Sequence, residues 1–201
     1  NAYGTFDLYY QQHGRAYLLD AVNPKIVSSV HYDVQFDNAY WDPDLKQVVY
    51  GDQSYFYPYV SLNFANADDV VAHELTHGVT HFTADLVYQN QSGQLNESYS
   101  DVFGELVDLF NGNAAFALGD GGRNWPVHPT GPGVDQLNSL RTECSPRTDY
   151  FDGVRWLLGE DAVAFGGAIR DLWDPTCYSD PDRALSPLQT CGPGDNGGVH
   201  G

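Results

Sequence analysis

The chain has 201 residues, a length that suits one domain or two small ones. Its 27 acidic residues outnumber the 9 lysines and arginines and give a formal charge of −18 at pH 7. This charge argues against nucleic acid as a partner, because phosphate contacts need Lys and Arg, and against an anionic membrane surface. No apolar run reaches the roughly 18 residues that cross a bilayer, so no membrane partner is expected.

The first half of the chain predicts a mixture of helices and strands. In chain order, the expected elements are the end of a helix at 6–14, strands at 26–32, 39–41 and 47–51, and helices at about 66–82 and 95–111. Gly14 is expected to close the first helix, and Asn66 is expected to cap the second. The Asp-Pro-Asp sequence between the second and third strands predicts a β-hairpin.

The second half of the chain has weaker patterns. Residues 112–150 are rich in Gly, Pro and Asn and are expected to form a long surface loop or insertion. Residues 151–201 consist of short segments separated by Asp-Pro turns. We therefore expect three parts, a core at 1–111, an insertion at 112–150 and a final segment at 151–201.

Three cysteines, an odd number, allow one disulfide and leave one thiol over. We expect Cys177 to pair with Cys191, which leaves Cys144 free or paired with a part outside this chain. Pairing of Cys144 with Cys177 is the alternative that spacing leaves open. The acidic composition, with 21 Gly and 11 Pro, favours a secreted protein, although the first residues do not have the pattern of a signal peptide.

The clearest chemical pattern is His73-Glu74-Leu75-Thr76-His77, within the helix expected at about 66–82. Histidines at i and i+4 lie one turn apart on one helix face, so both imidazoles can reach one ion, and neutral imidazole suits zinc. Glu74 can reach a metal-bound water without being a ligand, which makes it the candidate general base.

A third ligand has to come from elsewhere. His81 lies about 12 Å from His73 along the helix axis, too far to bind the same ion. The next helix carries a stripe of four acids at i, i+4, i+8 and i+11, namely Glu97, Asp101, Glu105 and Asp108. Such a stripe is either a solvated acidic face or a set of carboxylates paired with cations, and the apolar residues around it favour the second interpretation.

These residues resemble the thermolysin family of zinc endopeptidases. The resemblance rests on matching motifs at 28–32, 38–41, 49–52, 70–80, 86–90, 93–97, 100–101, 159–161, 170, 174–175, 180–182 and 195–200. The gap of 19 residues between His77 and Glu97 is also similar to that of the family. The resemblance covers the chain apart from the segment near 112–150.

The resemblance implies specific roles. His73, His77 and Glu97 would bind one zinc ion, and Glu74 would take the proton of the attacking water as zinc polarises the peptide carbonyl. Asp101 would hold a zinc-binding histidine through its other ring nitrogen. The groups that would stabilise or support the oxyanion are Tyr88 and His200, with Asp195 orienting His200.

The resemblance also implies substrate and calcium sites. Asn38 and Ala39 would pair with the peptide as an edge strand does, Arg170 would bind a substrate carbonyl, and Val70 and Leu158 would contribute to an apolar pocket. Calcium would be bound by Asp69, Glu105, Asp108 and Glu160. Arg155 stands where the family has an aspartate that bridges a second calcium ion, so we expect one calcium at most.

The implied fold class is α+β, a zincin core in which a β-hairpin sheet packs on two active-site helices. The family continues at both ends, so we expect its N-terminal β-rich part and C-terminal helical domain to lie outside this chain, where a second piece of the same precursor would be a partner. The implied function is that of a secreted zinc endopeptidase that cuts on the amino side of apolar residues. The alternative is a weak or inactive metal-binding fragment that serves as a binding or structural module.

Overall fold

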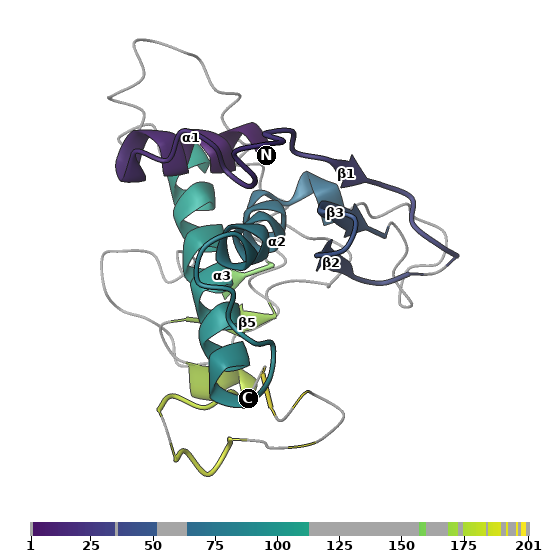
Figure 1. Cartoon of the computed structure of the whole chain (residues 1–201). Coiled ribbons are helices and arrows are strands. Elements are labelled where there is room, and N and C mark those ends of the chain that lie inside the picture. The colour runs from purple at the N-terminus through teal and green to yellow at the C-terminus, as the bar shows by residue number, and fades with distance from the viewer. Residues whose placement is uncertain are drawn as a thin grey trace.

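In the computed structural model, the described residues form three α-helices and two small sheets (Figure 1). The structure describes residues 2–34, 36–51, 64–112, 157–159, 169–172, 175–183, 185–189, 192, 196 and 198–199. The helices are α1 (Ala2–His13), α2 (Asp68–His81) and α3 (Asn90–Gly112). Short 3-10 turns lie at Phe64–Asn66 and Pro175–Tyr178.

The first sheet has three strands in the order β1-β3-β2. Strands β2 (Ala39–Asp42) and β3 (Gln47–Tyr50) form the expected antiparallel hairpin, in which Ala39 is opposite Tyr50. Strand β1 (Ser28–Ser29) pairs parallel with β3 and is much shorter than the strand expected at 26–32. A second, two-stranded antiparallel sheet joins β4 (Leu157–Leu158) to β5 (Arg170–Asp171).

Helix α2 is almost completely buried, which its apolar stripe alone does not require. Its core side chains Val71, Leu75 and Val79 pack on the sheet and α1, and the polar residues around them are buried as well. The expected cap at Asn66 is wrong, because Ala67 holds the N-cap position without a side-chain hydrogen bond. Asp68 and Asp69 in the first turn place negative charge at the positive end of the helix dipole.

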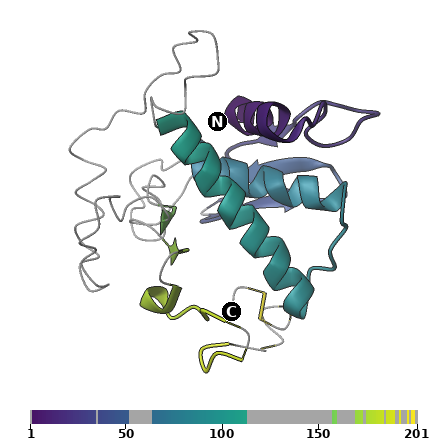
Figure 2. The same ribbon diagram turned by 90° about the vertical axis from the view of Figure 1, so that its left-hand side faces the viewer.

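Helices α2 and α3 pack tightly against each other, and Figures 1 and 2 show α2 crossing the middle of α3. Gly104 lies at this crossing. A Cβ atom there would come within 2.8 Å of the backbone oxygen of Asp69, so only glycine lets the backbones approach this closely. The crossing brings the acidic stripe of α3 against the histidines of α2.

Helix α3 begins at Asn90, five residues before the expected start at 95. Ser92 and Gly93 are poor helix formers, so the first turn depends on tertiary contacts that the local sequence does not reveal. The acidic stripe of α3 is buried and does not form a solvated face. Glu97, Asp101 and Glu105 are 6%, 7% and 0% exposed, whereas the apolar Leu95 on the same helix is 45% exposed.

The main hydrophobic core lies between α1, the first sheet and α2. Its buried members are Tyr9, Leu18, Leu19, Ala39, Val48, Tyr50, Phe64, Ala67, Val70, Val71, Leu75 and Val79. The hydroxyl groups of Tyr9 and Thr76 also form a hydrogen bond across this core, with their oxygens 3.0 Å apart. The core therefore packs the sheet and α2 into one unit, which holds the backbone of the α2 histidines in a fixed position.

Asn196, Gly198 and Val199 lie against the first turn of α3. The backbone N–H of Asn90 donates to the oxygen of Asn196 (2.9 Å), and the side chain of Gln94 donates to the oxygen of Gly198 (2.7 Å). A Cβ atom on Gly93 would overlap the side chain of Val199, which is 2% exposed. The contact requires glycine at position 93.

Replacing Gly93 with Ala is therefore expected to destabilise the protein by about 1–3 kcal/mol through overpacking, measured by denaturant unfolding. Gln91→Ala, at an exposed position of the same turn, is the control and should stay within about 0.5 kcal/mol of the parent. Equal stabilities of the parent and the Gly93→Ala variant would show that Val199 does not pack on α3 in solution.

Several expectations concern residues outside those that the structure describes. They include the segment 113–150, the side chains of Cys144, Cys177 and Cys191, and the residues Arg155, Glu160, Asp195 and His200. The disulfide stays a prediction. Within the described ranges, no helix combines the length and apolar character that crossing a membrane requires.

Candidate metal centre and cleft

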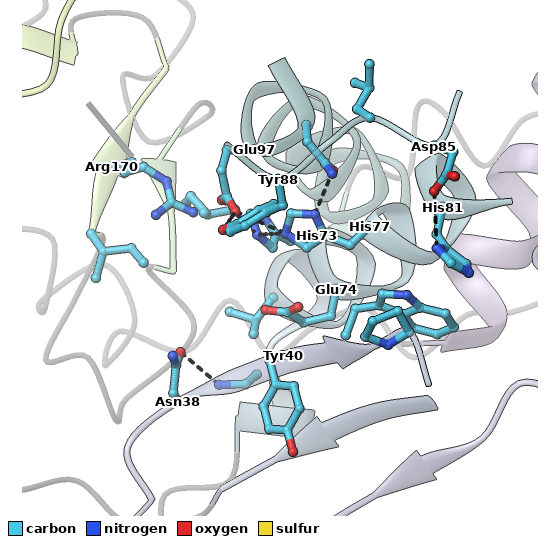
Figure 3. Close-up of a pocket in the computed structure, with 18 residues that line it drawn as sticks. Asn38, Tyr40, His73, Glu74, His77, His81, Asp85, Tyr88, Glu97 and Arg170 are labelled. Carbon is cyan, nitrogen blue, oxygen red and sulfur yellow. Dashed lines mark hydrogen bonds and ion pairs between the residues drawn. The ribbon is translucent and has the colours of Figure 1, made fainter. Parts of the chain in front are cut away.

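A cleft of about 470 Å³ runs along one side of α2 (Figure 3). Strand β2 forms one wall, α2 lies along it, and residues from the α2–α3 loop, α3, β4 and β5 complete the lining. Figure 3 shows Arg170 at one end of the cleft and His81 with Asp85 at the other. His73, His77 and Glu97 lie between these ends.

The three expected zinc ligands come together in the cleft. One ligand atom from each of His73, His77 and Glu97 lies within 4.8 Å of the others. The two Nε2 atoms are 2.9 Å apart, and each lies 3.4 Å from an oxygen of Glu97. Tetrahedral ligands at zinc distances of about 2.0–2.1 Å would be about 3.3 Å apart, so these separations fit one zinc ion without rearrangement of the backbone.

The other ring nitrogens of both histidines have polar partners. Nδ1 of His73 lies 2.8 Å from an oxygen of Asp101, and Nδ1 of His77 lies 2.8 Å from Oδ1 of Asn96 and 3.0 Å from Oγ of Ser100. With the proton on Nδ1, each imidazole donates to these oxygens and turns the lone pair of Nε2 towards the metal position.

Asn96 and Ser100 lie in the motifs that carry the family resemblance, but the sequence assigned neither of them a role. Both lie on α3 within one turn of Glu97, and both are buried, at 7% and 0% exposure. A polar residue beside a ligand has no distinctive spacing of its own, so only the packing of α3 on α2 identifies these two contacts. They orient His77 as Asp101 orients His73.

Charge around His73 affects its protonation. Burial alone would lower the pKa of His73, but the carboxylates of Asp101 and Glu97 outweigh burial and raise it to about 10. A metal-binding imidazole must be neutral at its ligand nitrogen, so protons compete with the metal for this site. Metal affinity should consequently rise with pH.

Asn96→Ala is expected to weaken zinc affinity by about 10- to 100-fold, because His77 loses a fixed orientation. Competition with a chromogenic chelator measures this affinity directly. Gln94→Ala, two residues away on α3 and outside the histidine contacts, is the comparison variant and should bind zinc as the parent does. Unchanged zinc affinity in Asn96→Ala would contradict the orienting role.

Glu74 is separate from this ligand group. Its side chain is 7% exposed, lines the cleft and lies between the histidines and β2 (Figure 3). Successive helix residues point about 100° apart, which is why the neighbour of a ligand faces the cleft instead of the ion. Glu74 therefore faces the cleft beside the group formed by His73, His77 and Glu97.

The remaining groups that the resemblance assigns to catalysis are only partly described. The hydroxyl of Tyr88 donates to Glu97, and the Tyr88 side chain lines the cleft at 40% exposure. In this arrangement Tyr88 contacts an expected ligand, in place of the oxyanion that the resemblance assigns to it. His200 and Asp195 lie outside the described residues, although Val199 is fixed on α3.

Arg170 forms a bidentate ion pair with Asp101. Its Nε and Nη2 atoms each donate to one carboxylate oxygen at 2.7 Å. Burial would raise the pKa of Asp101, but Arg170 and then His73 hold it below its usual value. Arg170 therefore connects the β5 end of the cleft to the histidine through one carboxylate, besides lining the cleft itself.

The other expected substrate-binding residues also line the cleft. Asn38 and Ala39 come from the start of β2, and Oδ1 of Asn38 accepts the N–H of Ala39 at 2.9 Å. Val70 and Leu158, 5% and 2% exposed, lie at the end where Arg170 is found. The cleft thus has an apolar part next to a guanidinium.

The expected calcium residues that the structure describes lie near the crossing of α2 and α3. Asp69 and Glu105 are 1% and 0% exposed, and Asp108 is half-buried. Asp69 accepts the backbone N–H of Gly159, next to Glu160, which lies outside the described residues. These contacts bring buried carboxylates of two helices close to the β4 region.

Two family models match the chain. The thermolysin metallopeptidase catalytic-domain model matches residues 1–81, and the thermolysin metallopeptidase alpha-helical-domain model matches residues 84–128. Helix α3 lies within the residues that the second model matches.

Known metalloproteases are similar to nearly the whole of this chain. Bacillolysin from Bacillus caldolyticus is 37% identical over 197 residues, and thermolysin from Alicyclobacillus acidocaldarius is 37% identical over 199. Each alignment covers 98% of this chain, and the chain spans 28% of the length of either relative. Neutral protease NprE from Bacillus pumilus is 36% identical, and the chain spans 49% of it.

Among solved structures, the precursor of protealysin, a metalloproteinase from Serratia proteamaculans, is 40% identical with a TM-score of 0.46. That match covers 54% of this chain and 33% of the protealysin chain. Both family models are of thermolysin metallopeptidases, and the two relatives at 37% identity align over 98% of this chain. The chain therefore belongs to the thermolysin family of metallopeptidases.

Proposed function

We propose that this chain carries the catalytic centre of a zinc endopeptidase. The observation that supports this most is the convergence of His73, His77 and Glu97 on one point of a cleft that Glu74 also lines. A bound zinc ion would supply Lewis-acid polarisation of a peptide carbonyl and activation of water. The chain spans 28% of the length of its relatives, so the activity of the whole protein is also a proposal.

Different residues of the chain would accept the proton, orient the metal ligands and stabilise the oxyanion. Glu74 would accept the proton of the attacking water and deliver it to the leaving nitrogen, and its buried position in the cleft keeps it close to both. Asp101 and Asn96 would hold the two imidazoles in the ligand orientation. Tyr88, once its hydroxyl leaves Glu97, and His200 held by Asp195, would donate hydrogen bonds to the developing oxyanion.

Substrate would lie along β2. Strand β2 is an edge of its sheet in the described part of the chain, so the backbone of Ala39 can pair with an extended peptide, and Asn38 would contribute a side-chain hydrogen bond. Val70 and Leu158 would contact an apolar side chain that follows the cleaved bond. Arg170 would bind a substrate carbonyl with the guanidinium donors that Asp101 does not use.

A quenched peptide with an apolar residue after its central bond tests this function. We expect hydrolysis by the zinc-loaded protein, loss of hydrolysis with a chelator and recovery when zinc is restored, with cleavage before the apolar residue by mass spectrometry. Zinc binding without hydrolysis would instead support the second candidate, a metal-binding module without turnover. That candidate is favoured only by the fraction of the relatives' length that the chain spans.

Calcium is a separate part of the proposal. The buried carboxylates of Asp69 and Glu105, with Asp108, would bind at most one calcium ion together with Glu160. Calcium added to zinc-loaded protein is expected to raise the melting temperature by a few degrees, since about 1 kcal/mol shifts Tm by roughly 2–4 °C for a chain of this size. Absence of any calcium-dependent shift would favour ion pairing by Arg155 instead.

The acidic composition and the low number of basic residues support an extracellular location. Partners would be peptide or protein substrates and, given the length of the relatives, a second piece of the same precursor. Intact mass and terminal sequencing of active material would identify such a piece.

A further inference from the structure

We infer that the end of the cleft formed by Trp41, His81 and Asp85 is a recognition site for a cationic side chain, Lys or Arg, of the substrate. This inference rests on the proposed function and adds a preference that the metal centre does not determine. It concerns the end opposite Arg170, beyond His77 (Figure 3).

The cleft continues past the metal ligands along α2. His81 lies one further turn beyond His77 on the same helix face and lines the cleft, together with Trp41 from β2 and Asp85 from the following loop. The ring centroids of Trp41 and His81 are 6.4 Å apart. Trp41 and Asp85 thus both contact His81, and an aromatic ring with a carboxylate nearby can bind an ammonium or guanidinium group.

Asp85 supplies the negative charge. Its side chain is 80% exposed, and its Oδ1 lies 3.5 Å from Nδ1 of His81. The backbone holds it in place, because the N–H of Asp85 donates to the oxygen of Thr80 at 2.8 Å. The carboxylate can therefore accept hydrogen bonds from a ligand.

The basic side chains near the two ends of the cleft already have acidic partners. Arg170 at one end is balanced by Asp101, and Lys46, in the β2–β3 turn near the other end, is paired with Asp20 at 3.3 Å and lies over the ring of Phe82. The exposed carboxylate of Asp85 is thus left to act on a ligand at its end. The overall charge of −18 also attracts cationic peptides.

The position of the cationic residue in the substrate follows from the distances along α2 and along an extended peptide. One helix turn, about 5.4 Å, separates His77 from His81, and an extended peptide advances about 3.3 Å per residue. If the apolar residue after the cleaved bond lies at Val70 and Leu158, the residues before the bond lie towards Trp41. The side chain that reaches Asp85 then belongs to the second residue before the bond.

Quenched peptides that differ only at this position, with Lys, Gln, Glu or Leu, test the inference. For the parent protein, kcat/KM is expected to be about 3- to 10-fold higher with Lys than with Gln, as for one exposed ion pair with a cation–π contact, and lowest with Glu. Added salt should reduce the Lys preference. Equal rates for Lys and Gln, or a higher rate for Leu than for Lys, would overturn it.

Asp85→Asn is the informative variant. Asp85 has a positive φ of 46°, which Asn tolerates well, so the fold should be kept while the charge is lost. The Lys-to-Gln ratio should fall to about 1. Asp44→Asn, the same charge change at an exposed position of the β2–β3 turn outside the cleft lining, should keep the parent ratio. A Lys preference that survives Asp85→Asn would refute the assignment.

Failure of the proposed function is detected separately. If no peptide of the set is hydrolysed, the endopeptidase proposal fails, and the recognition site is then tested by binding. The zinc-loaded Glu74→Gln protein is titrated with the same peptides, and the Lys peptide should bind about 3- to 10-fold more tightly than the Gln peptide only while Asp85 is present. Equal affinities would overturn the inference whatever the activity.

Discussion

Glu74→Gln is expected to reduce peptide hydrolysis by about 10²- to 10⁴-fold while zinc remains bound, because the amide cannot accept the proton of water. The structure separates base and ligand: Glu74 lines the cleft, and the three groups that converge are His73, His77 and Glu97. Metal content by mass spectrometry and kcat/KM on a quenched peptide measure the two properties independently.

The matched comparison for this variant is Glu97→Gln. It makes the same chemical change at a carboxylate whose oxygens lie 3.4 Å from both histidine Nε2 atoms, so zinc affinity and hydrolysis should fall together. Loss of zinc from Glu74→Gln, or retention of activity by it, would contradict the assignment of the two glutamates.

Asp101→Asn is expected to have the largest combined effect on stability and metal binding. The carboxylate of Asp101 pairs with Arg170 through two 2.7 Å hydrogen bonds and with His73 at 2.8 Å. Removing its charge leaves a guanidinium, whose side chain is only 23% exposed, without its partner. Breaking a buried pair costs about 3–5 kcal/mol, and the partial exposure of Arg170 places this one near about 3 kcal/mol.

The same variant should weaken zinc affinity by about 10- to 100-fold, because His73 is no longer held at Nδ1. Urea unfolding of the metal-free protein gives the stability change, and chelator competition gives the affinity. Asp182→Asn is the control, since Asp182 pairs with Arg183 on the surface and the side chain of Arg183 is 67% exposed. That substitution should cost less than about 1 kcal/mol.

The pH dependence of this stabilising contribution follows from the lowered pKa of Asp101 in the folded protein. Because the folded pKa is below the unfolded value of about 3.9, the contribution is complete above that pH. It is lost as the pH falls through the folded pKa. The stability difference between parent and Asp101→Asn should therefore be constant near neutral pH and shrink in acid.

The α+β architecture expected from the sequence is confirmed, because the elements that determine it carry strong local patterns. The helix around HExxH, the hairpin at 39–51 and the closure of α1 at Gly14 all follow from periodicity and turn residues. The helix starts that differ from those expected from the sequence lack local sequence signals. Asn66 does not cap α2, and α3 starts at Asn90 since Asn196 and Gly198 accept hydrogen bonds from its first residues.

By itself, the sequence determined which chemistry is available: two imidazoles one turn apart, an adjacent carboxylate and a stripe of acids on the next helix. Side-chain periodicity depends only on helix geometry, so these relations can be read from spacing. The tertiary structure decided which acid faces which histidine. The close crossing at Gly104 directs Glu97 to the metal position and Asp101 to both Nδ1 of His73 and Arg170, a partner 69 residues away that no local pattern could assign.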